Sequence, residues 1–191
     1  MGYILPLLTK LALLMLVGAG LLATPGCGGG DGDGDGNKTF EGDGYSFSYP
    51  EEWAEQAGDV TTGRLDAVVA PPEGGRNVVA LTVVPNAVPE PVTEANIDQA
   101  VRKNLRPAVD ALMQRAGGVL EGDPTQVTYG GFLGLRFESS STGLEPPVHL
   151  QGTWLIDGTT AYTFSCQFVP SGAEEVRQAC DLVLKSFQIS N

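Results

Sequence analysis

The chain has 191 residues, with 23 acidic and 11 basic residues, one histidine and three cysteines, and a formal net charge of −12. A length of this order indicates one domain with accessory segments. The negative charge argues against a nucleic-acid partner, which needs clustered Lys and Arg. One His and three Cys are too few for a closed Cys/His zinc site, and no glycine-rich nucleotide fingerprint or GxSxG motif occurs. The sequence therefore points to no metal and no cofactor.

The first 26 residues have the pattern of an export signal. Lys10 is the only charged residue before Asp31, and it precedes the uncharged apolar run from Leu11 to Leu22. A positive residue, a short apolar run and a boundary of small residues are typical of a secretory signal peptide. The run is shorter than the ~20 apolar residues that a transmembrane helix needs. We therefore expect residues 1–26 to be a signal peptide.

The end of this segment resembles the lipobox of bacterial lipoproteins, although Thr24 stands where that family usually has Leu. In that family the peptide is cut before the Cys, whose sulfur then carries a diacylglycerol. The resemblance implies that Cys27 is lipidated, and several acyl chains on one residue give stable membrane attachment. The expected location is the cell envelope, with the domain outside the cytoplasm and the membrane as a partner through the lipid anchor. An uncleaved signal anchor with a free Cys27 is the alternative.

Residues 27–38 are predicted to be a flexible tether. After the cysteine this segment contains Gly, Asp, Asn and Lys but no apolar residue, so it cannot offset the entropy of ordering. Asp31, Asp33 and Asp35 match the opening of an EF-hand calcium loop. The bidentate Glu of that loop would fall on Gly42, and only glycines precede the aspartates. A tether is the favoured interpretation, and calcium binding is the alternative.

Residues 39–191 are predicted to form one acidic α+β domain, because they carry nine basic and 20 acidic residues. Strands are expected from apolar alternation at residues 45–49, 66–70, 77–84, 125–129, 132–138, 148–156 and 160–169. Helices are expected at residues 93–116 and 172–185. The strand at 77–84 is apolar on both faces, so we expect it to be central in the sheet.

Four polar or cyclic residues predict the ends and the shape of these helices. Thr93 is expected to cap the first helix, and Pro107 is expected to kink or break it because proline removes a backbone donor. Ser171 and Glu174 have the spacing of a capping box at the start of the second helix.

Two cysteines occupy matching positions near the end of the chain. Cys166 shares the apolar face of its strand with Tyr162, Phe164 and Phe168, and Cys180 lies on the apolar stripe of the following helix. A helix that packs back on the strand it leaves brings these positions together, and exported chains meet an oxidising compartment. We therefore predict a Cys166–Cys180 disulfide; two buried thiols are the alternative.

The order of these elements resembles that of PsbP-like domains. The segment from Tyr45 to Trp53, with its aromatic strand and Tyr-Pro, is similar to the opening of that family, and Ser186-Phe187 is similar to its ending. The resemblance implies an antiparallel sheet of about six strands with helices on both faces, an α/β/α sandwich. The family includes the LpqN-like group of lipoproteins, and most members are binding or assembly proteins without catalytic residues. No binding residue of the family can be matched here.

The remaining polar and aromatic residues give little indication of catalysis. His149, the only possible imidazole base, shares a face of its strand with Gln151 and Thr153, and it is interpreted as a surface residue. Trp53 and Trp154 are interpreted as core residues, with ligand stacking as the alternative. The acidic pairs at residues 51–52 and 174–175 are interpreted as solvated surface.

The favoured function is a non-enzymatic, membrane-tethered binding or assembly module with an envelope protein as its possible partner. A carrier of a small ligand or lipid, held between the sheet and the kinked helix around Pro107, is the alternative. A hydrolase is a remote alternative, because no catalytic constellation can be identified.

Overall fold

The computed structural model describes residues 36–56, 59–60, 63–141 and 143–190. The predicted signal peptide, Cys27 and the three aspartates of the tether lie outside these residues. Within the described ranges, no helix is long and apolar enough to cross a membrane.

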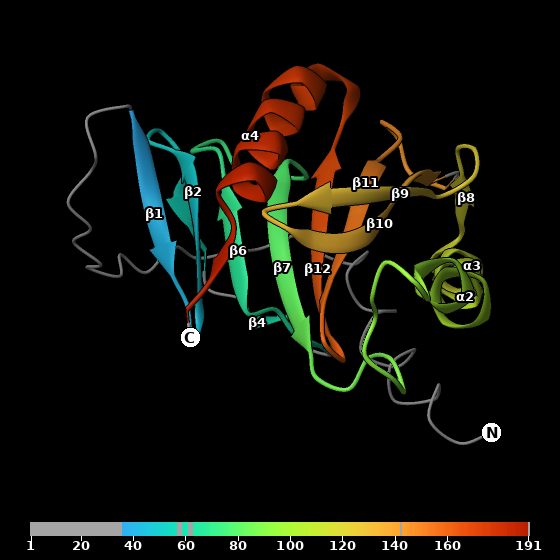
Figure 1. The fold of residues 1–191 in the computed structure, drawn as a ribbon. Coiled ribbons are helices and arrows are strands. Elements are labelled where there is room, and N and C mark those ends of the chain that lie inside the picture. The colour runs from blue at the N-terminus through green and yellow to red at the C-terminus, as the bar shows by residue number, and fades with distance from the viewer. Residues whose placement is uncertain (1–35, 57–58, 61–62, 142, 191) are drawn as a thin grey trace.

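The centre of the molecule is an antiparallel sheet of eight strands (Figure 1). The order across the sheet is β3 (Ala54–Glu55), β6 (Ala67–Ala70), β7 (Val78–Val84), β12 (Thr160–Phe168), β11 (His149–Asp157), β10 (Phe132–Ser141) and β8 (Gly118–Leu120). The eighth strand, β9 (Thr125–Tyr129), shares the outer edge of β10 with β8. The expectation of about six strands was therefore too low, because the short strands β3 and β8 lack the length that alternation needs to be recognised.

Two smaller sheets accompany the main one. β2 (Tyr45–Pro50) pairs with β1 (Asn37–Glu41) on one side and with β13 (Gln188–Ile189) on the other. The short strands β4 (Asp59–Val60) and β5 (Gly63–Arg64) pair with each other. In Figure 1 the β1–β2–β13 sheet lies at one end of the molecule and β8 lies at the other.

The first predicted helix is divided into three segments. α2 (Ile97–Ala100) is followed by a π-helical segment, η1 (Val101–Leu105), and then by α3 (Arg106–Ala116). Pro107 lies in the first turn of α3, directly after the π-helical segment, in which the Arg106 N–H donates to the Val101 carbonyl. The helix is therefore continuous, and the irregularity expected at this proline takes the form of a π-helical distortion on its N-terminal side.

The helix caps differ from those expected. α4 (Ala173–Ser186) follows a 3₁₀ turn, η2 (Pro170–Gly172), and Gly172 at its N-cap makes no side-chain capping bond. The capping box at Ser171 was therefore wrong, because the 3₁₀ turn moves the helix start one residue onward. The Thr93 cap was also wrong, since the Asn96 side chain accepts hydrogen bonds from Thr93 instead.

Both faces of the sheet are covered by a helix. On the face that we call the α4 face, Val79, Leu81, Phe164 and Cys166 share one core with Val176, Ala179 and Val183 of α4. On the opposite face, which we call the α3 face, Val84, Leu135 and Trp154 share a second core with Leu105 and Val109. β7 contributes to cores on both faces, as its doubly apolar sequence predicts. The hairpin between β9 and β10 also forms as predicted, with Gly130 and Gly131 at φ +57° and +86°.

Candidate functional site

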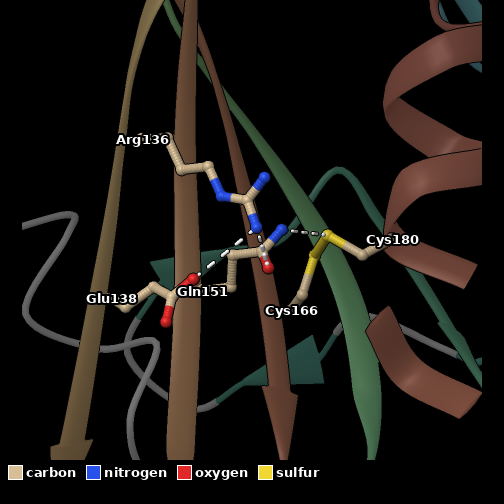
Figure 2. Close-up of a disulfide and its surroundings, with 5 residues drawn as sticks. All are labelled: Arg136, Glu138, Gln151, Cys166 and Cys180. Carbon is tan, nitrogen blue, oxygen red and sulfur yellow. Dashed lines mark hydrogen bonds and ion pairs between the residues drawn. A yellow bond between two sulfur atoms is a disulfide. The ribbon is translucent and has the colours of Figure 1, made fainter. Parts of the chain in front are cut away.

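A disulfide joins α4 to the central sheet. Cys166 of β12 and Cys180 of α4 are bonded, with their Cα atoms 6.0 Å apart (Figure 2). Both residues are at most 1% exposed. The predicted pairing is present, and it fixes the middle of α4 against the C-terminal part of β12.

A buried glutamine connects this disulfide to the edge of the α4 face. Gln151 of β11 lies between Glu138 and Cys166 as a direct cross-strand partner of both. Its Nε2 donates to Sγ of Cys180 at 3.3 Å, and its Oε1 accepts from Nη2 of Arg136 at 2.6 Å (Figure 2). The same Nη2 lies 3.6 Å from Oε1 of Glu138. Gln151 is 2% exposed, so the fixed amide holds a half-buried cation beside α4.

The histidine on the same strand is part of an aromatic and charged stack. The His149 ring lies parallel to the ring of Phe168, with centroids 5.6 Å apart, and its Nδ1 is 3.5 Å from Oε1 of Glu121. The Arg177 guanidinium of α4 lies over the Phe168 ring at 5.0 Å from the centroid. Since Gln151 is buried beneath α4, the interpretation of this strand face as plain surface was wrong, and His149 is half-buried.

These side chains form one rim beside α4. We call it the rim patch and define it by Arg136, Glu138, His149, Arg177, Glu121 and Val119. Val119 of β8 is 53% exposed and pairs with Ser140, the cross-strand partner of His149. Arginine and aromatic side chains around an exposed apolar residue are typical of protein contact surfaces. The rim patch is therefore the candidate functional site.

The comparisons with known proteins concern the fold. No protein-family model matches the sequence, and no curated protein matches it. The cyanobacterial PsbP protein CyanoP from Synechocystis is 17% identical over 85% of this chain and 98% of its own, with a TM-score of 0.55. LpqN of Mycobacterium tuberculosis, which is involved in cell envelope biogenesis, is 11% identical over 83% of this chain and 87% of its own, with a TM-score of 0.51.

The chain has a PsbP-like fold. A Bacteroides thetaiotaomicron protein is also similar, with 13% identity, a TM-score of 0.57 and coverage of 82% of this chain but 49% of its own. The resemblance predicted from the sequence is thus confirmed over most of the chain. At these identities the similarity describes the fold and does not transfer a function.

Both tryptophans of the PsbP-like domain lie in its core, as predicted. Trp53 is fully buried and donates from Nε1 to Oε1 of Glu175 at 3.0 Å. Trp154 is buried on the α3 face, where its ring meets Phe137 edge to face. Glu175 therefore has a structural role, because it accepts the hydrogen bond of a buried indole.

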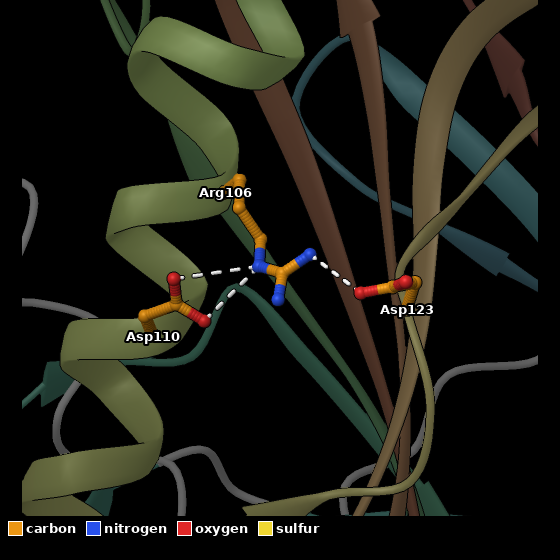
Figure 3. Close-up of polar contacts among 3 residues, drawn as sticks. All are labelled: Arg106, Asp110 and Asp123. Atoms are coloured by element: carbon orange, nitrogen blue, oxygen red, sulfur yellow. Dashed lines mark hydrogen bonds and ion pairs between the residues drawn. The ribbon is translucent and has the colours of Figure 1, made fainter.

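A second group of charges lies at the opposite end from β1. Arg106 of α3 donates to Asp110 at 3.1 Å and to Asp123 of the β8–β9 loop at 3.0 Å (Figure 3). These two hydrogen-bonded carboxylates, Asp123 first, raise the pKa of Arg106. Because the three side chains are exposed, the group adds little stability, and we assign it a local structural role.

Sequence reasoning missed every member of the rim patch except His149, and it missed the contacts of Gln151 that support the patch. Arg136, Gln151 and Arg177 come from three different elements, and no local motif joins them. Gln151 alone had a detectable signal, as a polar residue in a predicted strand with apolar neighbours. In the described part of the chain, no group of three His, Cys, Asp or Glu residues could hold a metal ion.

Proposed function

We propose that this chain is an exported lipoprotein whose PsbP-like domain is a non-enzymatic binding or assembly module. In this proposal Cys27 carries the lipid anchor, and the rim patch contacts an envelope protein. The observation that carries the proposal is the buried Cys166–Cys180 disulfide, because such bonds form and persist outside the reducing cytoplasm. The involvement of LpqN in cell envelope biogenesis supports the same setting by analogy of fold.

The position of the domain relative to its predicted anchor leaves the β8 end of the rim patch free for a partner. Gly36, the first described residue, follows Cys27 by nine residues, which span at most about 30 Å when extended. β1 begins directly after this segment and lies at the opposite end of the molecule from β8, which contributes Val119 (Figure 1). The β8 end of the patch can therefore face away from the attachment point.

Charge favours the rim patch over other surfaces of the domain. The domain carries nine basic and 20 acidic residues, so its net charge repels acidic partners. The rim patch gathers Arg136, Arg177 and His149 against two glutamates, which makes it nearly neutral. A protein partner can bury such a surface at a lower desolvation cost than a purely acidic one.

The experiment is a crosslinked pull-down from host membranes with the intact lipoprotein. The double variant Arg136→Ala/Arg177→Ala should recover at least tenfold less partner than the wild type. The matched control Arg102→Ala/Lys103→Ala removes two exposed charges near α2 and should recover the wild-type amount. Equal recovery by both variants, with folding verified by circular dichroism, would show that the rim patch does not contact the partner.

His149 has no catalytic role in this proposal. Its ring packs against Phe168 and its Nδ1 faces Glu121, which together account for both its orientation and its polar contact. If a hydrolytic activity of the purified protein were abolished by His149→Asn while the unfolding midpoint stayed unchanged, the non-enzymatic proposal would be wrong.

A further inference from the structure

The arginine of α4 has no carboxylate beside it, although the helix carries acidic residues. Each of these acidic residues contacts another group: Glu174 contacts Gln178, Glu175 contacts Trp53, and Asp181 contacts Lys185. Within the described residues, the Arg177 guanidinium makes no hydrogen bond and no ion pair. Arg177 is exposed in a domain with 20 acidic and nine basic residues. It is therefore a cation whose counterion is not found in the described part of its own chain.

The aromatic ring of Phe168 restrains this guanidinium. The ring is 4% exposed, and the guanidinium carbon of Arg177 lies over it at 5.0 Å from the centroid. A cation–π contact restricts the side chain without occupying a particular N–H donor, so the donors of Arg177 stay available for an acceptor. A side chain that is already restrained loses less entropy when it binds.

A second guanidinium of the rim patch also keeps unused donors. Nη2 of Arg136 is shared between Oε1 of Gln151 at 2.6 Å and Oε1 of Glu138 at 3.6 Å. Figure 2 shows the other terminal nitrogen, Nη1, pointing away from both of these side chains. Among the residues that the structure describes, Nε and Nη1 have no hydrogen-bond partner. Because Gln151 is buried against the disulfide, Arg136 is held in place with these donors free.

The glutamates of the rim patch each have a basic side chain beside them. Glu138 lies beside Arg136, and Glu121 lies beside His149. Arg177 is left over from these pairs, so the charge of the patch that lacks a neighbour of opposite sign is positive. A carboxylate is the acceptor that matches a guanidinium best, because it can accept two parallel N–H hydrogen bonds from the same fork.

We propose that the envelope protein that binds the rim patch presents Asp or Glu side chains to Arg177 and to the free donors of Arg136. This inference rests on the proposed function and specifies the chemistry of its contact. The net negative charge of the domain acts at longer range and disfavours a partner that is acidic as a whole. The partner is therefore a neutral or basic protein whose carboxylates are confined to the contact surface.

The space between the sheet and the helix around Pro107, where the sequence placed a small ligand as the alternative, is filled. Leu105, Ala108 and Val109 are each at most 1% exposed there, and they share a core with Leu135. This packing supports a partner bound at the surface rather than a ligand enclosed beside the helix.

The test replaces the arginines by lysines that can be cross-linked. A carbodiimide joins an ammonium group to a carboxylate in contact with it through an amide bond and takes up the water that is released, whereas a guanidinium does not react. The intact lipoprotein in host membranes carries either Arg177→Lys, or Arg136→Lys with Glu138→Gln, which removes the neighbouring carboxylate. Both variants should form an adduct with the same protein, joined through an Asp or Glu side chain that mass spectrometry identifies. Arg102→Lys, at an exposed position of η1, is the matched control and should form no adduct with that protein.

A photoreactive amino acid in place of Val119 distinguishes a failure of this inference from a failure of the proposed function, because Val119 is exposed in the same patch. If Val119 captures a protein but neither lysine variant forms an adduct with it, the carboxylate contact is overturned and the proposed function stands. If none of these variants captures a protein, both are overturned. An adduct through the C-terminal carboxyl group of the partner would also contradict the proposed side-chain contact.

An exchange of charges separates direct pairing from a structural role of Arg177. Arg177→Glu alone should lower the recovery of the partner about tenfold, and so should a lysine at the mapped carboxylate of the partner. The two changes together should restore most of the recovery, because the charges are opposite again. If recovery is not restored while circular dichroism shows that the Arg177→Glu variant is folded, Arg177 does not face that carboxylate.

Discussion

Nε2 of Gln151 donates a hydrogen bond to Sγ of Cys180 across 3.3 Å. This contact places the polar end of a β11 side chain against the disulfide that anchors α4. The Oε1 of the same amide accepts a hydrogen bond from Arg136. Side chains of three elements, β10, β11 and α4, therefore meet at Gln151. The rim patch depends on this arrangement, because β10 contributes Arg136 and Glu138, β11 contributes His149 and α4 contributes Arg177.

The disulfide should contribute substantially to the stability of the domain. The bond closes a loop with a sequence separation of 14, so Cys166→Ala/Cys180→Ala should lower the free energy of unfolding by about 3 kcal/mol. Urea titration with and without reductant measures this difference. Cys27→Ser is the control and should leave the midpoint unchanged. A midpoint insensitive to reductant would show that the bond does not stabilise the fold.

Gln151 and Arg136 should be energetically coupled. Gln151→Leu removes the closer acceptor of a half-buried guanidinium, which keeps only its ion pair with Glu138, and should cost about 1–2 kcal/mol. Arg136→Leu should cost a similar amount, and the double variant should cost less than the sum by about 1 kcal/mol. Chemical denaturation of the four proteins in this cycle gives the coupling energy. Additive effects would mean that the hydrogen bond makes no net contribution to the free energy of unfolding.

Gly152 should tolerate no larger residue. A Cβ there would overlap the Phe137 ring on the adjacent strand, so Gly152→Ala should destabilise by roughly 1–3 kcal/mol. Adding Phe137→Leu to that variant should recover part of the loss. Gly143→Ala is the matched control, because a Cβ at that exposed position meets nothing within 4 Å. Equal thermal midpoints for the two alanine variants would contradict this packing.

Stability should fall at alkaline pH through Tyr49. Burial, followed by the hydrogen bond to Glu55 and its charge, raises the pKa of Tyr49 to about 12 from its ordinary 10. The folded state holds the proton more tightly, so this stability is complete below pH 10 and is lost as pH rises from 10 to 12.

Tyr49→Phe should therefore reduce the pH dependence of the urea midpoint between pH 10 and 12. Tyr162→Phe should reduce it as well, because burial, with the nearby Asp157 charge, also raises the pKa of Tyr162. A wild-type midpoint that does not change over this range would show that neither phenol is held in its protonated form.

The sequence predicted the regular part of this fold because alternation reports directly which side chains are buried. The face shared by Tyr162, Phe164, Cys166 and Phe168 forms as expected, and so does the disulfide that depends on it. The sequence-based predictions were wrong where the local pattern of apolar residues is weak. β8 has three residues, and the start of α4 depends on a 3₁₀ turn rather than on the Ser171 side chain. Gln151 meets Arg136 and Cys180 only through strand register and helix placement, which no local pattern encodes.

We propose that the domain is exported, anchored through Cys27 and held together by the Cys166–Cys180 bond. The most direct test is the intact mass of the protein extracted from host membranes and treated with an alkylating agent under denaturing, non-reducing conditions. We predict a chain that begins at Cys27, carries acyl mass and takes up no alkyl group. A full-length chain without acyl mass and with three alkylated cysteines would show that the protein is neither lipidated nor disulfide-bonded.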